Sequence, residues 1–406
     1  MHPDTMRLID RWVGIPLCFL ASLWPWRKFR SKFNQQLKNT SVYPQTIVFI
    51  CVSEIGALVV SYPAIKEARR KFPKSRICFI TAPSGSEALE LMGFEKEDIF
   101  LLETISAKSL IKGILEVRKF FSGGMVSAII LEPFVRFSTL LSAWIGASQR
   151  VGFYRFKNEG VYLGNILTHR LIYNSHLHAS QTYFSLTKAL IEGESKEPLL
   201  KESVPSQLHK RLRINIKEKE RKILIKRLKE EDKKIVLKKI VLINANASDI
   251  VPLRKWPLEN FVMLGKKLIE NREITLVFTG NKNEKKACDY LSKEIDPKRT
   301  INFAGKTSFK DLITLYSIGN LLVTNDSGPV HFASTTDIPI VALFGPETPK
   351  IFGPMSPQAK VISMGLACSP CITVFNQKKS TCSDNQCMKK ISVEMVIKEI
   401  YKILLK

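Results

Sequence analysis

Residues 321–333 read LLVTNDSGPVHFA, and this stretch decides the fold class. A continuous apolar run that ends in a polar turn is typical of a strand buried on both faces of a parallel sheet. Gly328 lets the backbone approach a ligand closely, and Pro329 suits the first position of a helix that starts there. The stretch therefore predicts a strand, a tight turn and a helix, which is the repeating unit of α/β sheets.

The turn also carries polar groups suited to a phosphorylated sugar. The free N–H groups and positive dipole end of a helix that starts here would face a phosphate at the end of the strand. Ser327 adds a hydroxyl donor, Asp326 can accept hydrogen bonds from sugar hydroxyls, and His331 lies one turn into the helix. The alternative interpretation is a helix N-cap and turn with no ligand.

The same alternation continues on both sides of this stretch. Strands are predicted at 46–52, 76–81, 99–102 and 126–131, and again at 240–244, 274–279, 320–325 and 338–344. Helical spacing is predicted at 55–72, 84–92, 107–121, 134–145, 257–271 and 284–295. Such a series indicates two parallel, doubly wound, Rossmann-like domains that face a cleft, with ligands at the carboxyl ends of the strands.

The chain has 406 residues, which is enough for two domains. We expect a basic N-terminal arm at 1–40, a first Rossmann-like domain at 41–194 and a second at 240–390, with a C-terminal helix at 391–406. Between the domains, residues 195–239 include KEKERKILIKRLKEEDKK. The mixed charges favour an exposed helical linker over a nucleic-acid-binding segment.

Composition and charge narrow the function classes. Apolar residues make up 45% and charged residues 24%, as in folded globular proteins. The net charge of +25 favours anionic partners, although a lysine-rich surface is an alternative explanation. The sequence carries no nucleic-acid recognition module, so we expect no nucleic-acid partner. No apolar run reaches the length of a membrane-spanning helix.

The N-terminal arm contains an apolar, tryptophan-rich segment. Residues 12–26 read WVGIPLCFLASLWPW and are too short to span a bilayer. A short apolar segment with three tryptophans and a basic flank favours an anionic membrane interface, and the alternative is a helix packed on the protein's own body. The segment does not resemble a secretory signal. The basic flank comprises Arg27, Lys28, Arg30 and Lys32.

Four of the eight cysteines cluster near the C-terminus, with the spacing C-x2-C-x10-C-x4-C. This spacing could support a structural, tetrahedral zinc site, and reduced thiols or a local disulfide are the alternatives. The other four cysteines lie in apolar settings and are predicted to be buried thiols. The clustered residues are Cys368, Cys371, Cys382 and Cys387, and the others are Cys18, Cys51, Cys78 and Cys288.

The stretch 321–333 resembles the nucleotide-sugar motif of glycosyltransferase family nine, the heptosyltransferases of lipopolysaccharide synthesis. Residues 339–349 (PIVALFGPETP) and 244–261 (NANASDIVPLRKWPLENF) resemble the same family in matching order and spacing. The resemblance implies a two-domain GT-B fold and an inverting, metal-independent transfer from ADP-heptose. It also implies a lipid-linked glycan acceptor and a cytoplasmic protein, peripheral on the inner face of the membrane.

The resemblance also implies roles for individual residues of the second half. In the family, residues at three equivalent places contact the donor: the first set contacts the diphosphate, the second the nucleoside and the third the base. Charge-assisted bonds from arginine to phosphate fit the first role independently. A plain turn or a surface helix start is the alternative for the other two groups. The residues are Ser248 with Arg254 or Lys255 for the diphosphate, Gly280 with Asn283 or Glu284 for the nucleoside, and Gly305 and Lys306 for the base.

The first half departs from the family at one position. The family's first strand leads into a Gly-Asp pair whose Asp is its expected general base, whereas this chain has Gly56 followed by Ala57. An inverting displacement needs a base for the acceptor's proton, and Glu54 is the nearest carboxylate. We therefore predict Glu54 as the catalytic base. The alternative is that Glu54 caps the helix and the base is elsewhere or missing.

Two other functions compete with a transferase. A GT-B-like sugar-nucleotide epimerase would need no lipid acceptor, but it leaves the N-terminal arm unexplained. A non-catalytic nucleotide-sugar-binding protein is suggested by Ala57. In the favoured mechanism, Asp326 orients the sugar, the amides at 327–328 with Arg254 or Lys255 stabilise the leaving diphosphate, and Glu54 deprotonates the acceptor.

Overall fold

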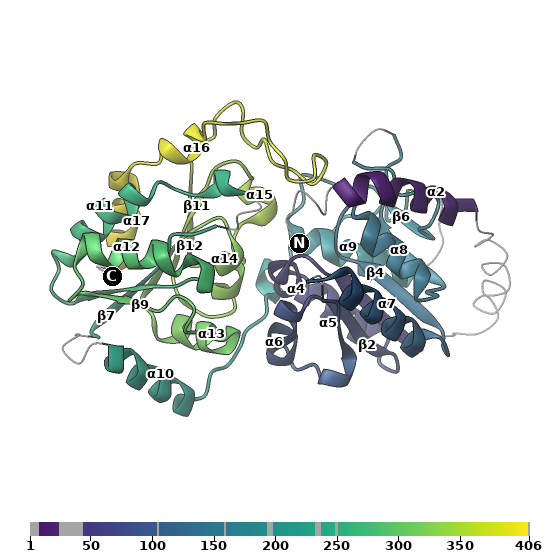
Figure 1. Ribbon diagram of the computed structural model, residues 1–406, viewed down its shortest axis with the longest axis horizontal. Helices are drawn as coiled ribbons and strands as arrows, with labels where there is room; N and C mark the ends of the chain where they lie inside the picture. The colour runs from purple at the N-terminus through teal and green to yellow at the C-terminus, as the bar shows by residue number, and fades with distance from the viewer. Residues whose placement is uncertain are drawn as a thin grey trace. The chain divides into compact units, whose positions relative to one another are not determined.

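The computed structural model describes residues 8–23, 44–103, 105–157, 160–192, 198–231, 237–247 and 251–404. The chain forms two compact units, Met1–Lys210 and Arg211–Lys406. Each contains one six-stranded parallel sheet with helices around it, which confirms the predicted α/β class (Figure 1). The predicted cleft concerns the arrangement of the two units and stays a prediction.

The sheet of the first unit has the order β3-β2-β1-β4-β5-β6. Successive strands are added in one direction from β1 to β3 and in the other from β4 to β6, so the switch point where such sheets bind ligands lies between β1 and β4. The strands are β1 (Thr46–Cys51), β2 (Arg76–Thr81), β3 (Ile99–Leu101), β4 (Val126–Ile130), β5 (Gln149–Phe153) and β6 (His169–Leu171). The helices that follow them are α4 (Ile55–Val60), α5 (Tyr62–Lys71), α6 (Pro83–Leu91), α7 (Ala107–Phe121), α8 (Arg136–Trp144) and α9 (Ala179–Glu192).

Helices cover both faces of this sheet because alternate side chains of each strand point to opposite faces. On one face, Val48 and Ile50 of β1 join a buried cluster with Val117 of α7 and Leu141 of α8. On the other face, the ring of Phe49 stacks on Phe79 of β2 at 5.7 Å. Two buried faces explain why the strands appear in the sequence as continuous apolar runs.

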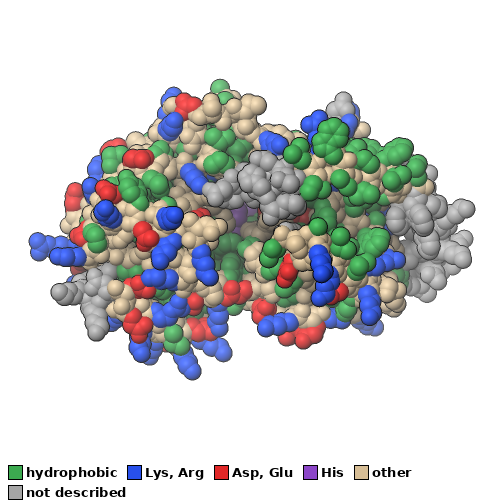
Figure 2. All heavy atoms as spheres, viewed as in Figure 1, with side chains coloured by type: hydrophobic (Ala, Val, Ile, Leu, Met, Phe, Trp, Pro, Cys, Tyr) green, Lys and Arg blue, Asp and Glu red, His purple; other side chains and the backbone are tan. Residues whose placement is uncertain are grey.

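The N-terminal segment forms η1 (Asp10–Gly14) and α2 (Ile15–Leu23). Its inner face packs on the first unit, where Cys18 contacts the cluster of Ala143 and Ile166 and Asp10 forms an ion pair with Arg136. Its outer face exposes large apolar side chains, which Figure 2 shows as a hydrophobic area over α2. The exposed residues are Leu8, Ile9, Trp12, Val13, Ile15, Leu17, Phe19, Leu20 and Leu23.

The second unit repeats the same topology, with strand order β12-β11-β10-β7-β8-β9. Its switch point lies between β7 and β10. The strands are β7 (Lys239–Asn244), β8 (Ile274–Phe278), β9 (Thr300–Asn302), β10 (Leu321–Asn325), β11 (Ile340–Phe344) and β12 (Ala359–Ser363). The main helices are α10 (Glu218–Glu231), α11 (Leu258–Ile269), α12 (Lys285–Ile295), α13 (Phe309–Ile318), α14 (Gly328–Ala333) and α17 (Val393–Leu404).

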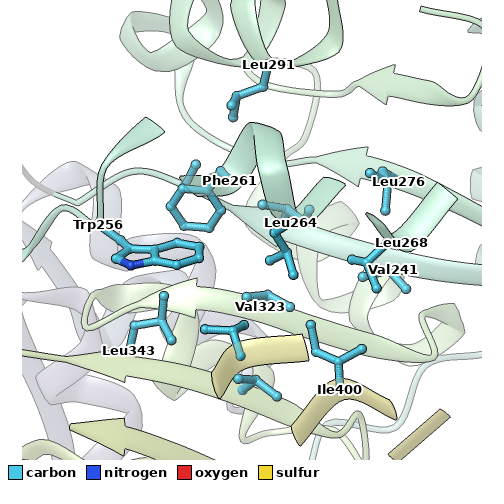
Figure 3. Packing of buried hydrophobic residues seen from close by; sticks show 14 of the residues in the cluster. Val241, Trp256, Phe261, Leu264, Leu268, Leu276, Leu291, Val323, Leu343 and Ile400 are labelled. Atoms are coloured by element: carbon cyan, nitrogen blue, oxygen red, sulfur yellow. The ribbon is translucent and has the colours of Figure 1, made fainter. Parts of the chain in front are cut away.

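The core of the second unit lies between the sheet and the helices α11, α12 and α17. Val241, Val323 and Leu343 of three neighbouring strands face Leu264 of α11 and Ile400 of α17 (Figure 3). Each of these five side chains is completely buried. The C-terminal helix is therefore part of this core.

The unit boundary after Lys210 falls inside the predicted linker 195–239. The helix α10 of that segment packs against α13, where Lys310 forms an ion pair with Glu220 at 2.6 Å and Arg227 with Asp311 at 2.9 Å. The predicted charged helix is present as α10, whose only buried residues are Leu224 and Leu228, and these ion pairs attach it to the second unit. Within the described ranges, no helix is long and apolar enough to cross a membrane.

Candidate functional site

The carboxyl ends of β10 and β11 place two acidic residues side by side in the loops that follow. These strands pair in parallel, with Asn325 opposite Leu343. The backbone N–H of Asp326 donates to the carbonyl of Leu343 at 2.9 Å, so Asp326 extends the pairing by one residue. Glu347 follows three residues after β11. Both side chains are nearly inaccessible, with 2% of Asp326 and 3% of Glu347 exposed.

Asn325 fastens the loops around this pair. Its side chain is fully buried, and its Nδ2 donates to the carbonyl of Ala245, after β7, at 2.9 Å. Its Oδ1 accepts the backbone N–H of Trp256 at 3.2 Å. One amide side chain thus joins the ends of β7 and β10 to the segment that carries Arg254 and Lys255.

Trp256 anchors that segment to the core. Its indole is 1% exposed, packs edge-to-face on Phe261 at 4.8 Å, and donates from Nε1 to the carbonyl of Ile391 at 2.8 Å (Figure 3). A rigid anchor one or two residues away restricts where the half-buried side chains of Arg254 and Lys255 can reach. Ser248 lies outside the described residues.

Arg254 brings a positive charge to the two buried carboxyl groups. It ends the short helix η4 (Pro252–Arg254), and its Nη1 lies 3.3 Å from Oε2 of Glu347. The side chains are 12% and 2% exposed, so this ion pair is mostly shielded from water. Sequence reasoning selected Arg254 but missed Glu347, although the stretch FGPETP places its carboxylate directly after a buried strand.

Burial and charge both act on Asp326. Removal from water raises the pKa of Asp326 well above its usual range, and the Glu347 carboxyl raises it further, while Arg254 and Lys378 act in the opposite direction. Perturbed carboxyl groups at a switch point are typical of functional sites. The structure therefore brings together Asp326, Arg254 and Glu347, of which the first two were predicted.

The turn after Asp326 differs in detail from its prediction. Ser327 is the N-cap of α14, but its Oγ donates to the carbonyl of Asn325 at 3.3 Å and makes no capping hydrogen bond. A Cβ on Gly328 would lie 2.9 Å from the ring of Phe332, so this glycine permits close packing within its own helix. The helix begins at Gly328, one residue before its predicted start at Pro329, and His331 is half-buried.

The carboxyl ends of β8 and β9 hold the residues predicted near the nucleoside. The N–H of Gly305, which has a φ of 73°, donates to the carbonyl of Gly280 at 2.8 Å. Glu284 accepts the N–H of Asn281 at 2.7 Å in a capping box, and the N–H of Asn283 donates to the side chain of Asn281 at 2.8 Å. These residues therefore lie together at the ends of β8 and β9, and their contacts with the nucleoside stay a prediction.

Lys306 follows Gly305 but is directed to another partner. Its Nζ lies 2.5 Å from Glu231 of α10, and its carbonyl accepts a hydrogen bond from Arg227. These contacts hold the second unit's first helix against the loop after β9. The base-contacting role of Gly305 and Lys306 stays a prediction.

At the switch point of the first unit, Glu54 precedes α4. It occupies the N-cap position, its side chain is exposed, and it makes no side-chain capping hydrogen bond. The Glu54 side chain therefore does not cap α4, and its role as the catalytic base stays a prediction. Ala57, at the position where the resemblance implies an aspartate, is buried inside α4.

A second carboxylate, Glu132, lies at the same switch point and was missed by sequence reasoning. It follows β4 and is 6% exposed. Its Oε1 accepts the N–H of Ser53 at 2.7 Å and the Ser53 hydroxyl, and its Oε2 accepts the Ser138 hydroxyl. Burial raises the pKa of Tyr183 well above its usual value, and the nearby carboxyl group of Glu54 raises it further. The end of the apolar run 126–131 was the only sequence signal for this position.

The eight cysteines are free thiols. Burial raises the pKa of Cys18 to about 11 and those of Cys78 and Cys288 to about 12, in agreement with the predicted buried thiols. Within the described ranges, no group of three or more His, Cys, Asp or Glu side chains is placed to hold a metal ion. The zinc site predicted from the C-terminal spacing stays a prediction. Its residues comprise exposed Cys368 and Cys382, half-buried Cys371 and buried Cys387.

Two successive units of the 3-2-1-4-5-6 strand order, with ionisable groups gathered at the switch point of the second, define a protein of the GT-B class. The family model of glycosyltransferase family 9 (heptosyltransferase) matches residues 128–381. The chain belongs to this family. The matched range includes Arg254, Asp326 and Glu347.

Similar proteins support the fold and the family. The lipooligosaccharide heptosyltransferase 2 of Campylobacter jejuni is 32% identical over 168 residues, covering 41% of this chain and 51% of that relative. The chain thus matches about half the length of this curated relative. The structure of Escherichia coli ADP-heptose LPS heptosyltransferase II matches with a TM-score of 0.67 and 19% identity, covering 89% of this chain and 98% of that chain. A family 9 glycosyltransferase of Veillonella parvula matches with a TM-score of 0.68, 21% identity and coverage of 89% and 97%.

Proposed function

We propose that this protein is an inverting, metal-independent glycosyltransferase that moves heptose from ADP-heptose to a lipid-linked acceptor of the lipopolysaccharide type. The observation that carries the proposal is the buried group of Asp326, Glu347 and Arg254 at the switch point of the second sheet. This group lies inside the segment that matches the family model. The names of the relatives, which include an ADP-heptose LPS heptosyltransferase, support the choice of donor and acceptor.

In the proposed mechanism, the second unit holds the donor. Asp326 accepts hydrogen bonds from the sugar hydroxyls, and Arg254 with Lys255 contacts the diphosphate. A guanidinium forms strong, directional bonds to phosphate oxygens, and these bonds strengthen as charge develops on the departing diphosphate. Fixed groups anchored through Asn325 and Trp256 need little reorganisation during the reaction, which favours the transition state.

The first unit supplies the base. The acceptor hydroxyl oxygen attacks the anomeric carbon as the bond to the nucleoside diphosphate breaks, and Glu54 takes the hydroxyl proton. The exposed position of Glu54, between the end of β1 and the start of α4, supports this role. Glu132, held by hydroxyl and N–H donors, stabilises the turn at Ser53 from which Glu54 projects.

Thermal unfolding with a panel of nucleotides and nucleotide sugars tests the donor site. We expect ADP-heptose to raise the Tm of the wild type and of Glu394→Ala, an exposed carboxylate on α17. We expect Asp326→Ala to lose the increase. Ligand at about 100 times its Kd adds about 2.7 kcal/mol to the free energy of unfolding. If no nucleotide sugar raises the Tm of the wild type, the proposed donor site is wrong.

Turnover on a lipid-linked acceptor then tests the base. We expect Glu54→Gln to bind ADP-heptose normally but to lose about 100-fold or more in kcat, since general base catalysis contributes about that much. A non-catalytic nucleotide-sugar-binding function is the second candidate, and Ala57 is the observation that favours it. Normal donor binding by the wild type without turnover on any acceptor would select that candidate.

We also propose that the protein acts at the cytoplasmic face of an anionic membrane, with the outer face of η1 and α2 in the interface. Nine exposed apolar side chains on this segment support the proposal, because amphipathic helices bury such faces among lipid headgroups. Sedimentation with phosphatidylglycerol vesicles tests it. We expect the wild type and Ile111→Asp, a control on α7, to sediment with the vesicles, and Trp12→Asp/Leu20→Asp to remain in the supernatant. Equal sedimentation of the double variant would contradict the role of α2.

A further inference from the structure

The carboxyl groups of Asp326 and Glu347 leave two oxygens without a donor. Oδ2 of Asp326 and Oε1 of Glu347 are buried, and neither accepts a hydrogen bond from the described residues. The two residues lie at the ends of paired strands, and the Glu347 carboxyl is near enough to raise the pKa of Asp326. A bond between two carboxyl groups requires a proton, since ionised carboxylates are only acceptors.

The charges around the pair favour one proton. If both carboxyl groups were ionised, two negative charges would face each other in a buried site, which is strongly unfavourable. One shared proton leaves a single negative charge, which Arg254 balances through its 3.3 Å contact with Glu347. The other charged or titratable groups nearby are Lys378, in the loop after β12, and His331, five residues after Asp326 in α14.

The loop that carries Glu347 is held in place from outside the sheet. The N–H groups of Cys371 and Ile372 each donate to the carbonyl of Pro346 at 3.0 Å, and the Ser369 hydroxyl donates to the carbonyl of Gly345. A Cβ on Gly345 would lie 2.5 Å from the sulfur of Met388, so this loop fits tightly against α16 (Gln386–Lys389). These contacts fix the backbone beside Glu347, while burial and the Arg254 contact restrict its side chain.

We propose that Asp326 and Glu347 share a single proton and together bind two neighbouring hydroxyl groups of the donor sugar. The shared proton lies between the two carboxyl groups, and the oxygens left without a donor accept hydrogen bonds from the two hydroxyls. The shared proton also keeps the site from repelling an anionic diphosphate beside Arg254. The role in sugar binding rests on the proposed function, whereas the shared proton does not.

Infrared difference spectroscopy tests the shared proton without any ligand. The carbonyl stretch of a protonated carboxyl group is separate from the bands of ionised carboxylates. At neutral pH we expect such a band in the wild type and in Glu394→Gln, an exposed carboxylate control. We expect its loss in both Asp326→Asn and Glu347→Gln, because each amide donates an N–H in place of the proton. The proposal would be overturned if the wild type showed no such band, or if either variant kept it.

The pH dependence of ADP affinity, with ADP as the probe, tests the consequence for binding. Because the protonated pair is the binding form, we expect wild-type affinity to fall by up to about tenfold per pH unit once the pair loses its proton. Glu347→Gln should keep its affinity over the same range, because its amide cannot ionise. A Glu347→Gln profile that follows the wild type would overturn the proposal. If ADP binds to neither protein while the infrared band is present, the donor site fails and the shared proton stands.

Discussion

The backbone N–H of Trp256 donates a 3.2 Å hydrogen bond to Oδ1 of Asn325, and this single contact links the two loops of the candidate donor site. Asn325 precedes Asp326, whereas Trp256 follows Arg254 by two residues. The amide of Asn325 also donates to the carbonyl of Ala245 at 2.9 Å. The relative position of the acid and the cation is therefore set by a buried side chain that needs no contact with substrate.

Asn325→Asp should disrupt this link with almost no change in shape. The new carboxylate would face the carbonyl of Ala245 without a donor and would bring a third acidic group to Asp326 and Glu347. We expect a loss of about 2–4 kcal/mol in the free energy of unfolding, measured by urea denaturation at neutral pH. A loss of less than about 0.5 kcal/mol would show that Asn325 does not hold the loops together.

Arg254→Met should expose the cost of leaving Glu347 buried without its cation. Breaking a buried ion pair by removing one partner costs about 3–5 kcal/mol, and the ability of the acidic pair to take up a proton makes the lower figure the expectation here. In Arg254→Met/Glu347→Gln, we expect most of the stability to return while ADP binding stays lost. Lys402→Met, at the exposed pair with Glu399, is the control and should change stability little. Additive losses in the double variant would contradict the ion pair's importance.

Much of the fold could be predicted from the sequence because both faces of each central strand are buried. The runs that became β1, β2, β4, β7 and β10 are continuous apolar stretches in the sequence. The strand β5 was missed because Arg150 interrupts its apolar pattern, and only the fold shows that this side chain is buried and donates from Nε to the carbonyl of Ile166 at 2.7 Å. The predicted helix 55–72 breaks at Ser61, and α5 begins at Tyr62, one residue before Pro63.

Only part of the candidate site could be predicted from the sequence. Asp326 and Arg254 were found because they lie in or beside recognisable motifs. Glu347 and Glu132 were missed, since an acidic residue after a strand usually indicates an exposed loop. Their burial depends on partners distant in the sequence: Arg254 for Glu347, and Ser53 for Glu132.

Gly164→Ala should detach α2 from the first unit. Gly164 has a φ of 68°, and a Cβ there would lie 2.4 Å from the carbonyl oxygen of Cys18 and 2.2 Å from the hydroxyl of Ser22. We expect faster hydrogen exchange across α2 and a loss of at least about 1 kcal/mol in stability. Gly123→Ala is the control, because a Cβ at Gly123 has no neighbour within 4 Å. Unchanged exchange in α2 would contradict its packing on Gly164.

Thiol reactivity and metal content test the C-terminal cysteines. In native protein at pH 8, we expect iodoacetamide to modify exposed Cys368 and Cys382 rapidly, and Cys78 and Cys288 only after unfolding, because burial raises their pKa to about 12. If the predicted zinc is bound, elemental analysis should find one zinc per chain, and a chelator should speed the modification of Cys387. No zinc and no effect of the chelator would refute the predicted site.

The pH dependence of stability follows from Asp326. Burial and Glu347 raise the pKa of Asp326 above its unfolded value, so the folded protein holds a proton that the unfolded chain has released. Stability from this group is fully present below the unfolded pKa of about 3.9 and is lost as the pH rises through the folded pKa. Asp326→Asn cannot ionise, so we expect its stability relative to the wild type to improve steadily as the pH is raised. Urea denaturation at several pH values, from about pH 5 to about pH 9, measures this difference. A constant difference between the two proteins across that range would show that Asp326 titrates at its ordinary pKa, and that burial and Glu347 do not hold its proton.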